Sequence, residues 1–211
     1  MEYNYLRDIL HKNIKTREQF PELKKVAMPG LEGDLPELLR KLNPGRWTPA
    51  AVLVGIVDRG DSLNVLLTQR GEGLKHHPGQ ISFPGGRIET GDQGPDDAAV
   101  REAHEEIGLD PGFVSVLGHL PDYLTISRYT VTPVIAMVKP GFSLKPDMQE
   151  ATDAFEVPLS FLMDTANHTL RKRQLFDHLV PVYEIHYQDR NIWGATAGMI
   201  VSLHQQLFNE N

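Results

Sequence analysis

Three carboxylates stand close together in the segment "REAHEEIGL". On a helix, Glu102, Glu105 and Glu106 are related as i, i+3 and i, i+4 neighbours and share one face. On a solvated face a like-charge pair costs only a few tenths of a kcal/mol, so an ordinary acidic surface explains the spacing equally well on energy alone. In a cleft, two carboxylates ~5 Å apart repel by about 3 kcal/mol and require a proton or a divalent cation. Oxygen ligands suit Mg²⁺ or Mn²⁺, and the spacing is therefore a candidate site for either ion.

A glycine-rich segment, "FPGGRIETGD", directly precedes this helix. Gly85, Gly86 and Gly91 allow the backbone to approach a ligand closely, and the N-terminus of the following helix favours an anion. A glycine pair alone is most often a turn. The conjunction of turn, helix N-terminus and carboxylates within one short segment predicts a site for phosphate and metal.

Both helices and strands are expected to position these residues. After turn residues at 43–49 the chain changes from helical spacing to short β-rich runs, and "RGDS" is typical of a hairpin between the first two runs. Without a regular βαβ repeat, the sequence predicts one α+β domain over 47–211 with a mixed sheet, preceded by a helical extension over 1–46 that includes spaced leucines at 35–42. The expected strands are 50–58, 63–70, 80–83, 113–120, 129–138, 179–187 and 191–194, and the expected helices are 97–108, 158–165 and 195–208.

Composition excludes several classes of protein. The formal charge is −7, from 28 acidic and 21 basic residues without long runs of either sign, which disfavours a nucleic-acid binder or a polybasic membrane patch. The absence of cysteine excludes disulfides, thiolate metal ligands and a cysteine nucleophile. The first residues lack the pattern of a signal peptide, and no apolar run is long enough to span a membrane, so we expect a soluble, cytoplasmic protein.

The acidic helix resembles part of a known family motif. With the preceding glycine, "REAHEEIGL" is similar to the Nudix box, G-x5-E-x7-R-E-U-x-E-E-x-G-U, where U is a bulky apolar residue. The loop between Gly86 and Arg101 is one residue longer than in that motif, so the early glutamate position falls on Asp92 or Gln93, and Glu89 or Asp92 is expected to brace the loop instead. Ala103 is small for its position. The matching residues are Arg101, Glu102, Glu105, Glu106, Gly108 and Leu109.

A second segment, "LLTQRGEGLKHHPGQISFPGG", resembles the signature of the coenzyme A pyrophosphatase branch of the Nudix hydrolases. Two positions depart from that signature, where Gly71 replaces serine or alanine and Lys75 replaces arginine. Lysine keeps the positive charge but loses the planar fork that binds phosphate bidentately. The matching residues are Leu66, Leu67, Thr68, Arg70, Gly79, Phe83, Pro84, Gly85 and Gly86.

The resemblance implies an α/β/α sandwich and the hydrolysis of coenzyme A, or a derivative, to 4′-phosphopantetheine and adenosine 3′,5′-bisphosphate. It implies Mg²⁺ or Mn²⁺ as cofactor and a small-molecule nucleotide as substrate, with a homodimer as one possible assembly. A Nudix hydrolase of ADP-ribose or dinucleotides, and a nucleotide-binding Nudix module without catalysis, stay open as alternatives.

The same resemblance assigns roles to individual residues. The metal ligands are Glu102, Glu105, Glu106 and the Gly86 carbonyl, the catalytic residues are Glu102, Arg101 and Glu150, and the substrate-binding residues are Arg70, Lys75 and Gly85. In these assignments Glu102 also activates water and Arg101 orients the glutamates. Asp153 is the second choice after Glu150 for an additional acid. Trp193 and Tyr123 are candidates to stack on adenine, although aromatic residues beside strand-like runs are usually core.

Overall fold

The computed structural model describes residues 1–14, 47–73, 77–175 and 178–208, so the expected helix at 35–42 lies outside the described residues. The main sheet has the strand order β3-β2-β1-β7-β5, with β4 on β1, β6 on β7 and β8 on β2. β1 and β7 run parallel, while the other pairs are antiparallel, which confirms a mixed sheet. Its strands are β1 (Thr48–Asp58), β2 (Leu63–Arg70), β3 (Ile81–Ser82), β4 (Gly85–Arg87), β5 (Val114–His119), β6 (Tyr123–Leu124), β7 (Tyr129–Val138) and β8 (Ala151–Pro158).

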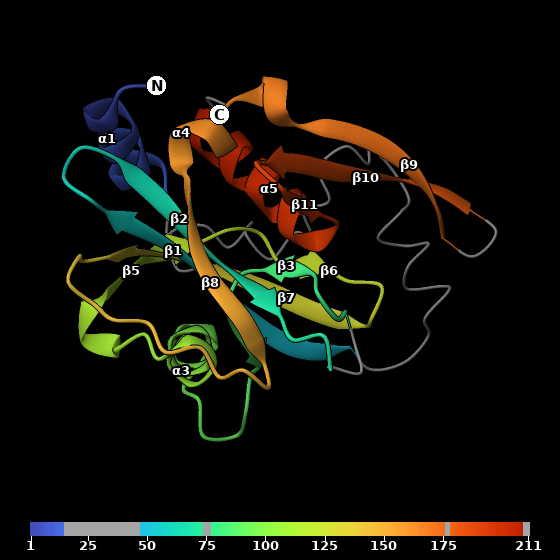
Figure 1. Ribbon diagram of the computed structural model, residues 1–211, viewed down its shortest axis with the longest axis horizontal. Coiled ribbons are helices and arrows are strands. Elements are labelled where there is room, and N and C mark those ends of the chain that lie inside the picture. Colours follow the sequence, from blue (N-terminus) through green and yellow to red (C-terminus); the bar gives the residue numbers. More distant parts are fainter. Residues whose placement is uncertain (15–46, 74–76, 176–177, 209–211) are drawn as a thin grey trace.

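Helices cover both faces of this sheet, as Figure 1 shows. On one face α3 (Pro95–Ile107) packs against β1, β4 and β7. On the other face lie α1 (Tyr3–Asn13), α4 (Leu159–Leu162) and α5 (Ala195–Phe208), with a short 3-10 turn at Thr165–Asn167, whereas the 3-10 turn at Pro111–Phe113 contacts α3. The result is the expected α/β/α sandwich.

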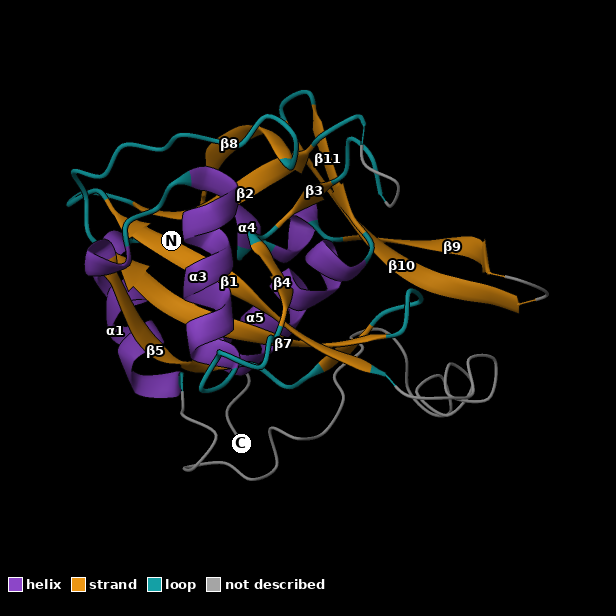
Figure 2. Cartoon of the chain, turned by 90° about the horizontal axis from the view of Figure 1, so that it is seen from below, coloured by secondary structure: helices purple, strands orange, loops and turns teal. Residues whose placement is uncertain are grey.

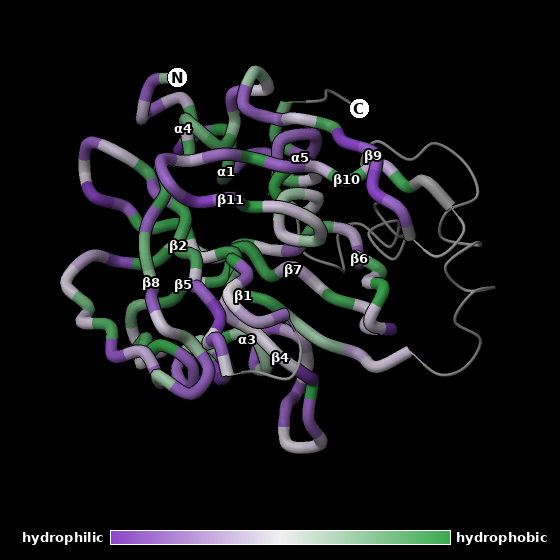
Figure 3. Tube along the Cα trace, turned by 45° about the vertical axis from the view of Figure 1, so that its right-hand side comes forward, coloured by the Kyte–Doolittle hydropathy of each residue, from purple (hydrophilic) through white to green (hydrophobic). Residues whose placement is uncertain are grey.

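A smaller antiparallel sheet extends from the sandwich in the order β11-β10-β9. Its strands are β9 (Thr169–Leu175), β10 (His178–Tyr187) and β11 (Arg190–Trp193), and β11 contacts β3 of the main sheet. Strand β9 is strongly hydrophilic (Figure 3) and lies at an edge. The small sheet and the strand ends β2 and β3 therefore border one another.

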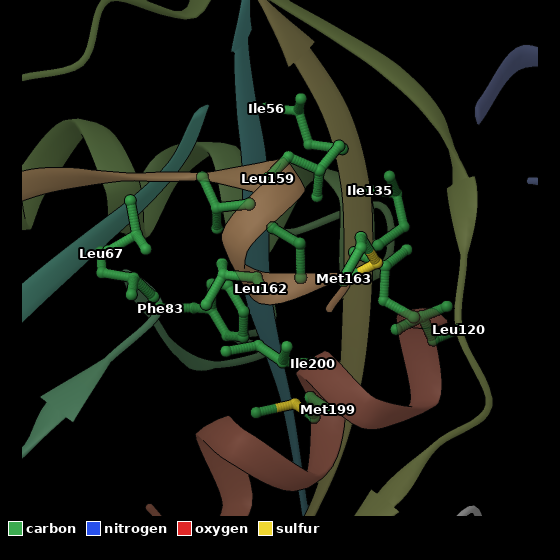
Figure 4. Packing of buried hydrophobic residues seen from close by; sticks show 14 of the residues in the cluster. Ile56, Leu67, Phe83, Leu120, Ile135, Leu159, Leu162, Met163, Met199 and Ile200 are labelled. Atoms are coloured by element: carbon green, nitrogen blue, oxygen red, sulfur yellow. The ribbon is translucent and has the colours of Figure 1, made fainter. Parts of the chain in front are cut away.

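Two apolar cores lie on opposite faces of β1. Val54 and Ile56 point into the larger core, whereas Leu53 and Val57 point into the smaller core under α3, because side chains alternate along a strand. Figure 4 shows the larger core, where residues of α4 and α5 pack on the sheet. The smaller core includes Ala99, Ala103 and Ile107 of α3, all fully buried. These three residues form the apolar face by which α3 packs on the sheet.

The first helix is joined to the larger core. Leu6, Leu10 and Ile14 are buried in it, and the amide of Asn13 donates to the carbonyl of Leu207 in α5 at 2.6 Å.

Within the described residues, no helix is long and apolar enough to cross a membrane.

Several elements differ from the sequence-based expectation. The acidic helix begins at Pro95, two positions before the predicted start. Strands β8 and β9, with the sequences "ATDAFEVP" and "TLRKRQL", were not predicted, since their charged residues obscure the alternation of a half-buried strand. The hairpin between β1 and β2 is confirmed.

Candidate active site

Two glycines bring β4 against the acidic helix. Gly86 pairs with Ala51 of β1, and α3 crosses both strands (Figure 2). A Cβ atom on Gly86 would lie 2.4 Å from the Cδ atom of Glu102, and a Cβ on Gly85 would lie 2.4 Å from the carbonyl oxygen of Ala51. Only glycine therefore allows the carboxylate of Glu102 to lie directly against the strand.

Glu106 is nearly inaccessible to solvent, with 5% exposure. Its Oε2 accepts a hydrogen bond from the backbone N–H of Gly85 at 3.2 Å, and its Oε1 lies 4.0 Å from Nη1 of Arg70. Burial raises the pKa of the Glu106 carboxyl to about 7 in spite of these two contacts. A buried carboxylate so poorly compensated is suited to receiving a cation.

Glu102 is partly buried beside Glu106. Burial raises the pKa of Glu102, while the hydrogen bond from Arg101 opposes that rise. The negative charge of Glu102 also raises the pKa of Glu106. The structure thus brings these two predicted residues together as a repelling pair.

Arg101 uses all five of its N–H donors. Nε and Nη2 donate to the two carboxylate oxygens of Asp92 at 2.9 Å, and Nη2 also donates to the carbonyl of Arg87 at 3.0 Å. Nη1 donates to Glu102 and to Glu105, each at 2.9 Å. A guanidinium with five satisfied donors holds a fixed orientation, so Arg101 ties the glycine strand, the loop and two of the acids into one unit.

Asp92 braces the lengthened loop. Besides the paired contact with Arg101, it accepts a hydrogen bond from the backbone N–H of Glu89 at 2.7 Å, and the bond from Arg101 holds the pKa of Asp92 below its usual value. Glu89 and Asp92 were the two residues expected from the sequence to brace this loop. The structure shows that the carboxylate of Asp92 makes these bonds.

Glu105 is the most exposed of the three acids. Its side chain is 55% exposed and is paired with Arg101. Within the described part of the chain, no group of three or more histidine, aspartate or glutamate side chains is close enough to form a ready metal site. Glu102, Glu106 and the Gly86 strand form the assembled part of the predicted ligand set, and Glu105 would have to turn inward to join them.

Of the predicted site residues, Glu150 is the one whose position relative to the acidic helix was least predictable from residue spacing. It lies in the turn directly before β8, where its carbonyl accepts a hydrogen bond from the N–H of Gly71 at 2.9 Å. Its charge raises the pKa of both Glu102 and Glu106, which places the carboxylate near that pair. Asp153, the second choice, is instead bound by Arg190 at 2.6 Å.

The structure describes only some of the predicted substrate-binding residues. Lys75 lies outside the described residues. Arg70 ends β2 beside Glu106, and its Nε is buried with no hydrogen-bond partner in the described part of the chain. The Arg70 side chain as a whole is 28% exposed, so a phosphate oxygen can reach the guanidinium from solvent. Arg190 was not predicted, because an arginine in a β-turn segment carries no distinguishing sequence signal.

Comparison with known proteins decides the family. The family description "NUDIX domain" matches residues 47–179, which is more than half of the chain. The chain belongs to the Nudix hydrolase family. A protein of Enterobacter sp. (strain 638), named uncharacterized Nudix hydrolase NudL, is 35% identical over 158 residues, covering 75% of this chain and 82% of the relative. The NudL protein of Escherichia coli (strain K12 / DH10B) is 36% identical over 159 residues, with the same two coverages.

Among solved structures, a Nudix hydrolase from M. smegmatis, RenU, shares 26% identity, covers 57% of this chain and 76% of its own, and has a TM-score of 0.47. Nudix hydrolases cleave pyrophosphate bonds in nucleotide derivatives and generally use a divalent metal ion such as Mg²⁺ or Mn²⁺. The residues present fit such an ion in chemistry, since the donors are carboxylate and carbonyl oxygens, and the nearest guanidinium nitrogen to the most buried of them, Glu106, is 4.0 Å away, beyond hydrogen-bond distance.

Proposed function

We propose that this Nudix hydrolase cleaves the pyrophosphate bond of coenzyme A or its derivatives, releasing 4′-phosphopantetheine, or its acyl form, and adenosine 3′,5′-bisphosphate. The observation that carries the proposal is the placement of Arg70. This residue belongs to the segment that resembles the coenzyme A pyrophosphatase signature, and its guanidinium lies beside the buried carboxylate of Glu106.

The rest of that segment supports the position of Arg70 through its own bonds. The hydroxyl of Thr68 is within 3.2 Å of the carbonyl of Ser82, and Phe83 is buried in the larger core. Gly79 has a φ of 68°, a conformation that favours glycine, and its N–H donates to the carbonyl of Arg70. The segment folds back on itself at this point, which turns the arginine towards α3.

The proposed roles follow from this arrangement. Glu102, Glu106, the Gly86 carbonyl and, after turning, Glu105 would hold Mg²⁺ or Mn²⁺, which screens the charge of the pyrophosphate and lowers the pKa of a bound water. Arg70 and Lys75 bind the phosphate oxygens, and the backbone N–H of Gly85 joins them only by leaving Glu106, to which it donates in the structure. Glu102, assisted by Glu150, takes the proton of the attacking water. Arg101 fixes Glu102 in place through the bonds described above.

A substrate panel tests the proposal. Coenzyme A, ADP-ribose and NADH are incubated with the full chain and Mg²⁺ or Mn²⁺, and the products are separated by chromatography. We expect the highest kcat/KM for coenzyme A. A higher value for ADP-ribose would establish the general Nudix alternative, and binding of nucleotides without any turnover would establish a binding module.

Substitution of Lys75 tests the motif itself. We expect Lys75→Ala to lower kcat/KM for coenzyme A, and Lys75→Arg to preserve or raise it, because a bidentate charged contact is stronger than a single one. Identical kcat/KM values in all three proteins would show that this segment does not select the substrate.

A further inference from the structure

The turn formed by residues 147–150 joins two parts of the candidate active site. The backbone N–H of Asp147 donates to the carbonyl of Glu106 at 2.9 Å, and this carbonyl belongs to the last turn of α3, where carbonyl groups lack a helical partner. At the other end of the turn, the carbonyl of Glu150 accepts a hydrogen bond from the N–H of Gly71, directly after β2, at 2.9 Å. The turn therefore bridges the end of the acidic helix and the end of β2, and the segment that carries it passes beside α3 (Figure 1).

Asp147 fixes the backbone of this turn. Its carbonyl accepts hydrogen bonds from the N–H groups of Glu150 at 2.8 Å and of Ala151 at 2.7 Å. Its side-chain Oδ1 accepts another from the N–H of Gln149 at 2.9 Å. An aspartate whose side chain binds the backbone N–H two residues later is typical of a tight turn. These bonds, together with the bond to α3, set the direction in which the side chain of Glu150 leaves the backbone.

Gly71 allows the turn to lie close to the end of β2. A Cβ atom at this position would lie 3.0 Å from the carbonyl oxygen of Gln149 and 3.7 Å from that of Glu150, and the shorter separation is tighter than an ordinary van der Waals contact. The coenzyme A pyrophosphatase signature has serine or alanine here, so the departure of this chain from the signature coincides with a close approach of the turn. A side chain at position 71 would displace the backbone of the turn, and Glu150 with it.

The carboxylate of Glu150 depends on this backbone for its position. Its side chain is exposed, and within the described part of the chain its carboxylate has no hydrogen-bond or ion-pair partner of its own. Its charge nevertheless raises the pKa values of Glu102 and Glu106. Because no side-chain bond holds the carboxylate, the backbone of the turn determines how far it lies from this acidic pair.

We infer that Asp147 and Gly71 are positioning residues that hold Glu150 beside the acidic pair of α3. The inference rests on the proposed catalytic role of Glu150. Asp147 shapes the turn, and Gly71 leaves room for it against β2. A misplacement of about 1 Å can lower the rate of a reaction about 10²-fold, so a small shift of the turn is enough for a measurable loss of kcat.

A double-mutant cycle tests whether Asp147 acts through Glu150. We expect Asp147→Ala to lower kcat about tenfold with less than about a twofold change in KM, because the turn loses a bond while the phosphate-binding residues keep theirs. In a chain that already carries Glu150→Gln, the same substitution should have no further effect on kcat. Asp147→Asn keeps an oxygen acceptor for the N–H of Gln149 and should preserve most of kcat.

Asp164→Ala is the matched control for Asp147→Ala. The Oδ1 atom of Asp164 accepts the same kind of bond, from the N–H of Ala166 at 3.0 Å, on the opposite face of the sheet, so this variant should keep the kcat of the parent. All variants are assayed with Mg²⁺ on coenzyme A and on ADP-ribose, and activity on ADP-ribose alone would reject the proposed substrate while the cycle remains measurable. Equal losses of kcat from Asp147→Ala in the two backgrounds, a normal kcat in Glu150→Gln, or turnover of neither substrate would overturn the inference.

Amide hydrogen exchange of the metal-free protein gives a readout that does not depend on activity. Asp147→Ala should raise the exchange rate of the Gln149 amide about tenfold, because this amide loses its acceptor. Gly71→Ala should raise the exchange rate of the amide at position 71, because its bond to the carbonyl of Glu150 lengthens. Unaltered exchange at both amides would show that neither residue holds the turn.

Gly73→Ala is the matched control for Gly71→Ala, because a Cβ atom at position 73 would meet no atom within 4 Å. Although alanine is a residue of the signature at position 71, we expect Gly71→Ala to lower kcat several-fold, whereas Gly73→Ala should leave kcat unchanged. Equal kcat values in these two variants would remove Gly71 from the assignment.

Discussion

Glu105 and Glu106 are neighbours in the sequence, yet they have very different surroundings. The two side chains point in different directions from α3. That of Glu105 is 55% exposed, whereas that of Glu106 is almost fully enclosed by β4. Helical spacing correctly predicts that both lie near the acidic face, but it gives no information about the strand that covers one of them. The enclosed carboxylate is the one whose ionisation opposes folding.

Substitution of Glu106 is expected to separate stability from activity. Its pKa in the folded protein is about 7, above the ordinary value of 4.5, so the folded state holds the extra proton between these pH values and stability falls as pH rises through that window. Glu106→Gln should stabilise the metal-free protein at pH 8 by up to about 3 kcal/mol, measured by urea unfolding. The exposed Glu105→Gln serves as the control and should change stability by less than about 0.5 kcal/mol.

The same variant is expected to lose turnover. If the lost ligand charge contributes ~4 kcal/mol to transition-state stabilisation, kcat falls roughly 10³-fold with Mg²⁺ present. Near-normal turnover in a folded Glu106→Gln protein would contradict the assignment of α3 as the metal-binding helix.

Glu150 should affect catalysis without affecting stability. It is an exposed turn residue, so Glu150→Gln is expected to leave the thermal midpoint nearly unchanged while kcat falls about 10²-fold, the usual effect of losing a group that moves a proton. Asp153→Asn is the matched comparison and should leave kcat nearly unchanged, because the carboxylate of Asp153 is held by Arg190. An unaltered kcat from neutral to mildly alkaline pH would make Glu150 an ordinary solvated charge.

At the scale of elements, the contact of β4 with α3 defines the site. Gly85 and Gly86 are consecutive, but the groups that exclude a side chain at each position differ: a backbone carbonyl and the Val52 Cα at the first, and the flexible end of Glu102 at the second. Backbone atoms can move aside only at a large cost in free energy, whereas the carboxylate of Glu102 can change its rotamer. The two glycines are therefore required for different reasons.

A pair of alanine substitutions tests this difference. Gly86→Ala should fold with nearly normal stability but displace the carboxylate of Glu102, so kcat/KM falls at least tenfold. Gly85→Ala should lower the free energy of unfolding by about 2 kcal/mol or more, since β4 must shift away from β1. Equal effects of the two changes on both stability and kcat/KM would contradict the geometry.

The elements that sequence alone predicts are those with regular apolar spacing. β1, β2, β7, α3 and α5 were all expected, since a buried face dictates their pattern. β8 and β9 were not, because pairing with a neighbouring strand, rather than burial, determines their structure. For the site, the sequence predicted Glu102, Glu106 and Arg101 on one helix. The positions of Glu150 and Arg190 depend on tertiary contacts that no local spacing encodes.

At the scale of the whole molecule, α1 stabilises the sheet from the face opposite α3 (Figure 1). Leu10 is fully buried in the larger core, and Leu10→Ala is expected to lower the free energy of unfolding by about 2–5 kcal/mol. The exposed Lys12→Ala, in the same helix, should have an effect below about 0.5 kcal/mol. Thermal or urea unfolding measures both. At temperatures where both variants stay folded, kcat should equal that of the parent, and a large loss of kcat in folded Leu10→Ala would show that α1 acts on the site.

The parallel pairing of β1 with β7 also governs how the protein folds. Thr48 pairs with Tyr129, and β2, β4 and α3 all lie in the chain between these two strands. Closing so long a loop is entropically unfavourable and gives the central pair a high contact order, which slows folding. Because the glycine strand and the acidic helix lie in that loop, we expect the proposed catalytic groups to assemble in the same cooperative step that completes the sheet. Recovery of activity during refolding should then follow the formation of the β1–β7 pair.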